Sequence, residues 1–264
     1  MKERIITGLV GFAAISVIIY IGTPAVLAFL TIAGIIATYE YGTVIYGTEH
    51  KLMSAFLAAL SGMIILSGYF YPNLTTSVLI SGTVMVFIVN ILIGNFDADH
   101  SVYSVWGLVY AGFFLSLATK MLTWDNGLFI VVMSAFLCMA SDVGAYFAGM
   151  KFGKHKLCPA ISPKKTVEGS IGGILLASVT ALVFAIMAKE IGYSKQWHLF
   201  ILIGAITAVL SQFGDLSASM VKRKFGAKDY GHILPGHGGF MDRLDSVLFG
   251  FAAVFCSFIV FGIL

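Results

Sequence analysis

The sequence has few charged residues and few cysteines, and each scarcity excludes a class of protein. Charged residues make up only 11% of the 264 residues, whereas a soluble domain usually carries about 25%. A water-soluble globular protein is therefore excluded. The three cysteines, Cys138, Cys158 and Cys256, have no CxxC spacing. They indicate neither a disulfide framework nor a zinc site.

Long apolar runs take the place of the missing charges, because 59% of the residues are hydrophobic. A helix that crosses a bilayer needs roughly 17–25 apolar residues, and nine stretches of about that length follow one another. We predict spans at Ile5–Ile21, Pro24–Tyr41, Ser54–Phe70, Thr76–Gly94, Val102–Leu122, Gly127–Gly149, Gly169–Ala188, Leu199–Ser219 and Ser246–Leu264.

This pattern predicts an all-α fold, a polytopic membrane helix bundle of about nine transmembrane helices in one domain, residues 1–264. Spans one to five fall in 1–122. Spans six to nine fall in 127–264, together with two polar loops at 150–168 and 220–245. The first apolar run lacks a convincing cleavage site and is expected to stay as a span.

The distribution of lysine and arginine predicts the orientation. With the N-terminus inside, 13 of the 16 Lys and Arg residues lie in inside segments. Lys and Arg favour the cytoplasmic side of a membrane protein. We therefore expect a cytoplasmic N-terminus, an outside C-terminus, and both polar loops on the cytoplasmic side, where nucleotides are found.

The loop 150–168 carries five lysines. In its second half Pro163 is expected to fix a turn, Lys164 and Lys165 follow, and Thr166 is placed to cap the next helix. Free N–H groups at a helix start favour a phosphate. A polybasic segment that only touches anionic lipid headgroups would look the same.

Acidic residues inside apolar spans are costly unless they face a partner, a cavity or an ion. Asp142 lies within the sixth span, on one helix face with Tyr146 and Gly149. Asp215 in the eighth span shares a face with Ser219 and with Lys222 and Arg223 at its end. A structural pairing with a basic side chain remains an alternative for Asp142. Glu40 is expected either to support a site or to face water.

Asp242 and Asp245 form an i, i+3 pair at the start of the last span. Two carboxylates on one face suit Mg²⁺, with Asp215 as a third ligand. The alternative is a pair of acids favoured by the helix dipole. The preceding glycine-rich turn lets backbone approach a ligand closely. Its His237 is interpreted either as a hydrogen-bond donor to a phosphate or as a turn histidine.

These residues carry a resemblance to the phosphatidate cytidylyltransferase family, the CDP-diacylglycerol synthases. The chain matches throughout the family's signature, at Ser219, Lys222, Arg223, Lys228, Asp229, Gly231, Leu234, Pro235, His237, Gly238, Gly239, Asp242, Arg243 and Asp245. The block Ser162–Gly169 resembles a second family motif, and Asp142 with Ala145, Tyr146 and Gly149 a third. The match covers roughly residues 138–249.

The resemblance implies a transfer of CMP from CTP to phosphatidic acid, giving CDP-diacylglycerol and pyrophosphate, at the cytoplasmic face of an inner membrane. It implies Mg²⁺ held by Asp215, Asp242 and Asp245, a second cation such as K⁺, and a homodimer. No nucleic-acid partner is expected. The implied catalytic residues are Asp215, Asp242, Asp245, Lys222, Arg223 and Lys165. The implied substrate-binding residues are Ser162, Lys164, Thr166, Lys228, His237, Gly238, Gly239, Arg243 and Asp142.

Two other readings remain open. A related lipid enzyme, either a CTP-dependent polyprenol or phytol kinase or a cytidylyltransferase acting on an ether lipid, would use similar parts. A transporter or channel would also carry intramembrane acids. Against the transporter stand the absence of an internal repeat and the crowding of polar residues on one side of the membrane.

Overall fold

The computed structural model describes residues 2–94, 97–189, 197–233 and 238–263, and only the backbone of residues 2–8. Its helices are α1 (Lys2–Ile21), α2 (Thr23–Tyr46), α3 (Lys51–Phe70), α4 (Thr75–Leu92), α5 (Ala98–Gly107), α6 (Phe114–Met121), α7 (Gly127–Phe152), α8 (Val167–Ala188), α9 (Trp197–Lys224) and α10 (Met241–Val260). A π-helical turn, η1 (Leu108–Phe113), joins α5 to α6, and two short strands are β1 (Lys156–Cys158) and β2 (Ser162–Thr166).

Eight helical segments within the described residues are long and apolar enough to cross a membrane, counting α5, η1 and α6 as one segment. The predicted first span corresponds to α1, whose described side chains form the shorter apolar stretch Leu9–Ile21. The all-α, polytopic fold predicted from the sequence is therefore confirmed, and the chain is a multi-pass membrane protein.

Helix ends differ most from prediction where the helices run into polar sequence. Helix α9 continues past Ser219 to Lys224, and α10 begins at Met241 instead of Ser246. Hydropathy marks only the apolar part of a helix, whereas the backbone hydrogen bonds continue into charged residues. Asp215, Asp242 and Asp245 consequently all lie within helices.

The loop between α7 and α8 contains a hairpin that the sequence did not predict. Strand β1 pairs antiparallel with β2, with an irregular register. Pro163 lies in β2 and not in the turn, so its predicted role is wrong. Two strands of three and five residues are too short to show a clear alternating pattern.

The chain divides into two compact units. Unit 1 contains residues 1–123 and 224–244, and unit 2 contains residues 124–223 and 245–264. The polar segment between α9 and α10 therefore belongs to unit 1, although the greater part of both helices belongs to unit 2. The two units are described separately below.

In unit 1, α2 packs on α3 through small and hydroxyl residues. A Cβ at Gly42 would lie 2.9 Å from the Cα of Ser54, so only glycine permits this approach. Thr38 donates a 2.9 Å hydrogen bond to Ser61 inside the same interface. Close contact at small residues is the usual basis of helix association in a membrane.

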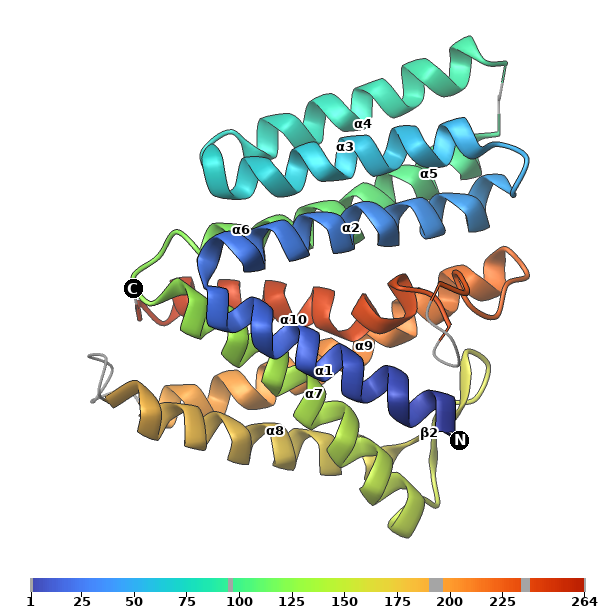
Figure 1. The fold of residues 1–264 in the computed structure, drawn as a ribbon. Helices are drawn as coiled ribbons and strands as arrows, with labels where there is room; N and C mark the ends of the chain where they lie inside the picture. The colour runs from blue at the N-terminus through green and yellow to red at the C-terminus, as the bar shows by residue number, and fades with distance from the viewer. Residues whose placement is uncertain (1, 95–96, 190–196, 234–237, 264) are drawn as a thin grey trace. The chain divides into compact units, whose positions relative to one another are not determined.

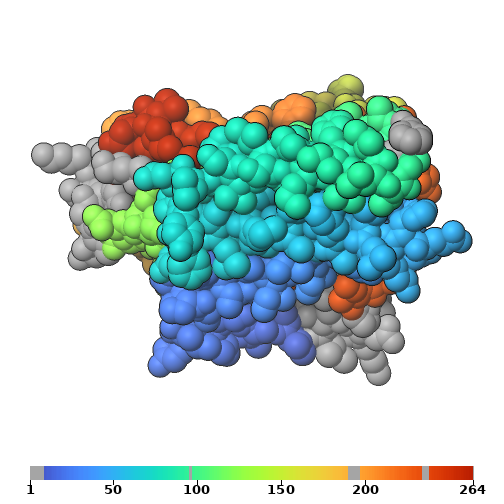
Figure 2. All heavy atoms as spheres, turned by 90° about the horizontal axis from the view of Figure 1, so that it is seen from above, coloured from blue at the N-terminus to red at the C-terminus, as the bar shows by residue number. Residues whose placement is uncertain are grey.

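Helix α4 lies beside α3 and forms part of the surface of unit 1 (Figures 1 and 2). Ile80, Val84, Ile88 and Ile91 are all at least half exposed. They recur every three or four residues and so form one stripe. A stripe of this kind on a membrane helix is suited to contact with lipid or with another apolar helix.

In unit 2, α7 and α8 are neighbours (Figure 1) and approach closely where glycines face each other. A Cβ at Gly144 would lie 2.6 Å from the carbonyl oxygen of Gly172. A Cβ at Gly173 would lie 2.7 Å from the carbonyl oxygen of Ser141. This glycine seam fixes the position of Asp142, which lies between these contacts along α7.

Candidate active site

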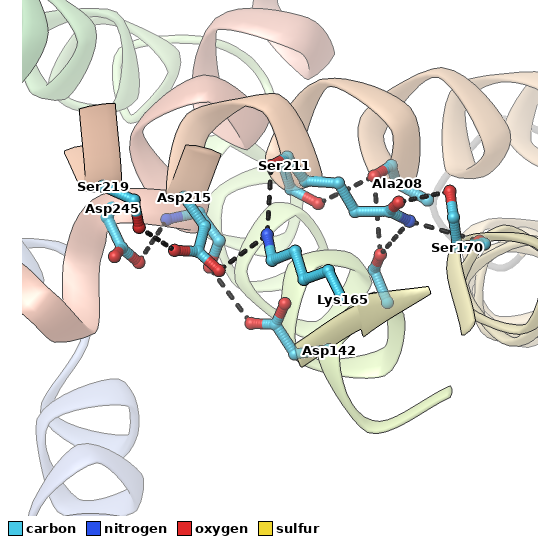
Figure 3. A network of polar contacts seen from close by, with 11 residues as sticks. Asp142, Lys165, Ser170, Ala208, Ser211, Asp215, Ser219 and Asp245 are labelled. Carbon is cyan, nitrogen blue, oxygen red and sulfur yellow. Dashed lines mark hydrogen bonds and ion pairs between the residues drawn. The ribbon is translucent and has the colours of Figure 1, made fainter. Parts of the chain in front are cut away.

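The polar centre of unit 2 is an ion pair between Lys165 of β2 and Asp215 of α9 (Figure 3). The Lys165 ammonium lies 2.7 Å from the carboxylate and also donates to the carbonyl oxygen of Gln212 at 3.3 Å. The two side chains are only 24% and 33% exposed. Partial burial makes this pair stronger than a surface salt bridge, because solvent screens it less.

Asp245 of α10 lies close to this pair. It is buried, its carboxylate accepts a hydrogen bond from the Ser246 N–H at 2.8 Å, and it interacts electrostatically with Asp215, Lys222 and Asp142. A Cβ at Gly214 would lie 2.5 Å from the carbonyl oxygen of Asp245. The glycine before Asp215 therefore allows α9 and α10 to approach closely enough to bring the two acids together.

Asp142 of α7 joins the same group. Its carboxylate accepts a hydrogen bond from the Ser246 hydroxyl at 3.1 Å. Three carboxylates from three helices thus gather in unit 2 with the ammonium groups of Lys165 and Lys222. Such a cluster of acids and lysines in a membrane protein is typical of a functional site.

The residues predicted to share one polar face of α9 do not all lie in the same environment. Ser219 donates a 3.4 Å hydrogen bond to Asp215, as their i, i+4 spacing predicts. Lys222 is buried, whereas the adjacent Arg223 is exposed. The two cations at the end of α9 therefore face different surroundings.

A hydrogen-bond network around Gln212 was not predicted from the sequence. Ser170 donates to the Gln212 side-chain oxygen at 2.5 Å, and the Gln212 amide donates to the Ser141 hydroxyl at 3.3 Å (Figure 3). Because the Gln212 carbonyl oxygen also holds Lys165, this network fixes the backbone that receives the lysine. A buried glutamine within an apolar span was the available signal.

The hairpin residues that were predicted to bind substrate differ in their exposure to solvent. Lys164 is exposed and Ser162 is half-buried. Thr166 caps α8, accepting the Gly169 N–H at 3.1 Å, as predicted. Glu168 accepts the backbone N–H groups of Lys154 and His155, which ties the start of the loop to the start of α8.

Removing the cap is expected to weaken this loop. A Thr166→Ala substitution loses the acceptor for the Gly169 N–H and should lower the free energy of unfolding by about 1 kcal/mol. Thermal unfolding of the purified protein in detergent, followed by circular dichroism, measures the change. Thr180→Ala is the matched control, since Thr180 is a half-buried residue of α8 whose hydroxyl donates to the Leu176 carbonyl oxygen of its own helix. Equal melting temperatures for the two variants would contradict the capping role.

The described signature residues between positions 228 and 243, called the signature segment below, form a second set of site residues, in unit 1. Asp242 accepts hydrogen bonds from the N–H groups of Tyr230 at 2.8 Å and Gly239 at 3.1 Å. Gly238 has φ +81°, a left-handed conformation that favours glycine. Lys228 and Arg243 are exposed. The predicted His237 lies outside the described residues.

Glu40 of α2 belongs with this segment and does not face water. It is 3% exposed, and its carboxylate accepts the Met241 N–H at 2.9 Å. The sequence left this residue undecided because its partner lies 201 residues away. Its burial excludes the solvent-facing alternative.

The oxygen-rich donors of these segments suit a hard cation such as Mg²⁺. Across the described ranges, however, no group of three or more His, Cys, Asp or Glu side chains is arranged to hold a metal ion. Asp215 is instead neutralised by Lys165. The predicted trio of Asp215, Asp242 and Asp245 therefore stays a prediction.

The fold and these residues define a class: a polytopic membrane protein with lysines and carboxylates gathered beside its spanning helices. Within that class, the chain belongs to the cytidylyltransferase family, whose model matches residues 2–261. It is therefore a CTP-using nucleotidyltransferase.

Individual relatives agree with this assignment. The chain is 31% identical over 261 residues to the phosphatidate cytidylyltransferase of Bacillus subtilis strain 168, covering 94% of each chain. It is 31% identical over 258 residues to that of Staphylococcus haemolyticus, covering 94% of this chain and 95% of the relative. It is 42% identical over 142 residues to that of Haemophilus influenzae, covering 53% of this chain and 48% of the relative.

Proposed function

We propose that this protein transfers CMP from CTP to phosphatidic acid and releases pyrophosphate. The observation that carries the proposal is the likeness to phosphatidate cytidylyltransferases along nearly the whole chain. The geometry supports it, since Lys165 of strand β2 pairs with Asp215 of the spanning helix α9, beside Asp245 of α10. A lipid phosphate and a nucleotide can meet at such a place without the acyl chains leaving the bilayer.

In the reaction a phosphate oxygen of phosphatidic acid attacks the α-phosphorus of CTP. The bond between that phosphorus and the bridging oxygen to the β-phosphate breaks, and pyrophosphate leaves. Phosphatidic acid is already an anion, so no strong general base is needed. The chain has to position the two phosphates and neutralise their charge.

Lys165 is the residue best placed for this task. Its ammonium is held by Asp215 and by the Gln212 carbonyl oxygen, so it is oriented before substrate arrives. Lys222 lies buried beside Asp245 and offers a second positive charge. Exposed Lys164 and Arg223 are suited to attract the triphosphate from water.

The charges of unit 2 support a divalent ion, although within the described residues no three carboxylates are arranged as a ligand set. Asp215, Asp245 and Asp142 supply three carboxylates against the two ammonium groups of Lys165 and Lys222, which leaves negative charge for a cation to balance. We propose that Asp215 and Asp245 hold Mg²⁺, and the sequence prediction adds Asp242. When bound, the ion would neutralise charge on the phosphate oxygens. A second cation, such as K⁺, remains a prediction.

Location and assembly complete the proposal. The excess of lysine and arginine on one side favours a cytoplasmic active site, and the bacterial relatives favour the inner membrane.

We also propose a homodimer. The mass of the purified protein in detergent, measured by light scattering, tests the dimer, and a monomeric mass would contradict it.

A product assay tests the reaction. Purified protein is given phosphatidic acid, CTP labelled at the α-phosphate, and Mg²⁺. We expect label in the lipid fraction, release of pyrophosphate, and complete loss of both with EDTA, reversed by excess Mg²⁺. Label in soluble CDP would instead support a lipid kinase. The absence of turnover with any lipid would contradict an enzymatic role, and unchanged activity in EDTA would contradict the divalent ion.

A further inference from the structure

Glu40 is a buried carboxylate for which the proposed reaction has no direct use. It lies in α2 and is 3% exposed. One of its oxygens, Oε2, accepts the N–H of Met241 at 2.9 Å. Met241 is the first residue of α10, where backbone N–H groups lack partners within the helix. Glu40 therefore caps α10 from a different helix.

Two glycines of the signature segment surround the same carboxylate. A Cβ built on Gly231 would clash with Oε1 of Glu40, and one built on Gly239 would lie 2.6 Å from Oε2. Gly231 does not have a positive φ, so its lack of a side chain is required by space and not by backbone conformation. The segment is thus folded closely around the Glu40 side chain.

Asp242 holds the same segment from the other side. Its Oδ2 accepts the N–H groups of Tyr230 and Gly239, and the Tyr230 ring stacks on Tyr41, the residue after Glu40, at 5.6 Å. Two carboxylates therefore hold the backbone N–H groups of Tyr230, Gly239 and Met241. Glu40 is the carboxylate that α2 contributes.

Burying a carboxylate in a spanning helix is unfavourable unless it is bonded. The bond from the Met241 N–H at the start of α10 compensates for part of that cost at Oε2, whereas Oε1 has no hydrogen-bond partner among the described residues, and the bond fixes the position of the donating group. Fixing Met241 also fixes Asp242, the next residue in the same helix.

We propose that Glu40 is a positioning residue: it sets the conformation of the signature segment and the direction of Asp242, without touching the substrates. This inference rests on the proposed cytidylyltransferase function. It predicts that changes at Glu40 impair catalysis through the segment, even though Glu40 lies outside the sequence signature.

The test compares Glu40→Gln and Glu40→Ala with Glu49→Gln, a change of an exposed glutamate in the same unit. Glutamine keeps an oxygen for the Met241 N–H, so we expect kcat to fall about 5-fold for Glu40→Gln and about 50-fold for Glu40→Ala. These values correspond to losing part or all of a hydrogen bond to a charged group. The KM for phosphatidic acid should change less than twofold, because Glu40 makes no substrate contact.

Hydrogen exchange gives a readout that does not depend on activity. The amides of Gly239 and Met241 should exchange at least 10-fold faster in both Glu40 variants than in wild type, whereas amides in the middle of α3 should be unchanged. Gly231→Ala, which intrudes on the carboxylate from the opposite side, should reproduce the faster exchange. This variant keeps the test decisive if Glu40→Ala does not fold.

Wild-type exchange at Gly239 and Met241 in Glu40→Gln and Gly231→Ala would overturn the positioning role. So would a kcat for Glu40→Ala within twofold of Glu49→Gln. Faster exchange in a protein whose wild type makes no CDP-diacylglycerol would instead uphold the structural contact and reject the proposed reaction. The two failures are therefore distinguishable.

Discussion

Replacing Asp245 is expected to reduce turnover by about 1,000-fold or more. Asp245 is buried beside Lys222 and Asp215, and the proposed chemistry uses it to hold a cation worth several kcal/mol of charge stabilisation. Both Asp245→Ala and Asp245→Asn should show the loss. The asparagine keeps the shape of the side chain and an oxygen for the Ser246 N–H, but it lacks the negative charge.

The measurement is the rate of CDP-diacylglycerol formation at saturating CTP and phosphatidic acid, alongside a thermal melt. Asp125→Asn is the control, because Asp125 is an exposed aspartate of the same unit. An Asp245→Asn protein that melts like wild type and keeps its turnover would rule out a charged role for this residue.

Replacing Lys165 is the second change with a large expected effect. Lys165→Met keeps most of the side-chain volume and removes the charge, so Asp215 loses its 2.7 Å partner and the phosphates lose an oriented cation. We expect kcat/KM for CTP to fall about 100-fold, the loss of one to two charge-assisted hydrogen bonds. Lys165→Arg should recover part of the loss, since it restores the charge with a different geometry.

Steady-state kinetics with varied CTP measure the effect, and Lys189→Met provides the control because Lys189 is an exposed lysine of unit 2 at the C-terminal cap of α8. If Lys165→Met stays within threefold of Lys189→Met, Lys165 serves only to balance Asp215.

Local patterns were sufficient to predict the helices and the Thr166 cap. A span depends on a run of apolar residues, and a cap depends on residues three positions apart, so both can be read from adjacent sequence. The hairpin of β1 and β2 escaped because it is short and polar, and its position is fixed by Glu168 and by the following helix. The same local reasoning placed the start of α10 five residues late.

The contacts that the site residues make with one another could not be predicted from local sequence, because tertiary structure determines them. Lys165 and Asp215 were both singled out, but their pairing follows from the packing of the hairpin on α9. Ser246 was missed because its hydroxyl meets Asp142 across 104 residues of chain. Glu40 was left undecided for the same reason, since its partner is contributed by the last helix.

The order of these residues along the chain matters for how the protein is made. A ribosome adding about 5–20 residues per second needs roughly 5–20 s to pass from Asp142 to Ser246. Helix α7 therefore reaches the insertion machinery with its carboxyl group well before the Ser246 hydroxyl exists. Helix α8 follows much sooner, and the glycine seam lets it pair with α7 at once. The α7–α8 contact can therefore form before Asp142 gains its hydroxyl partner, which is synthesised 104 residues later.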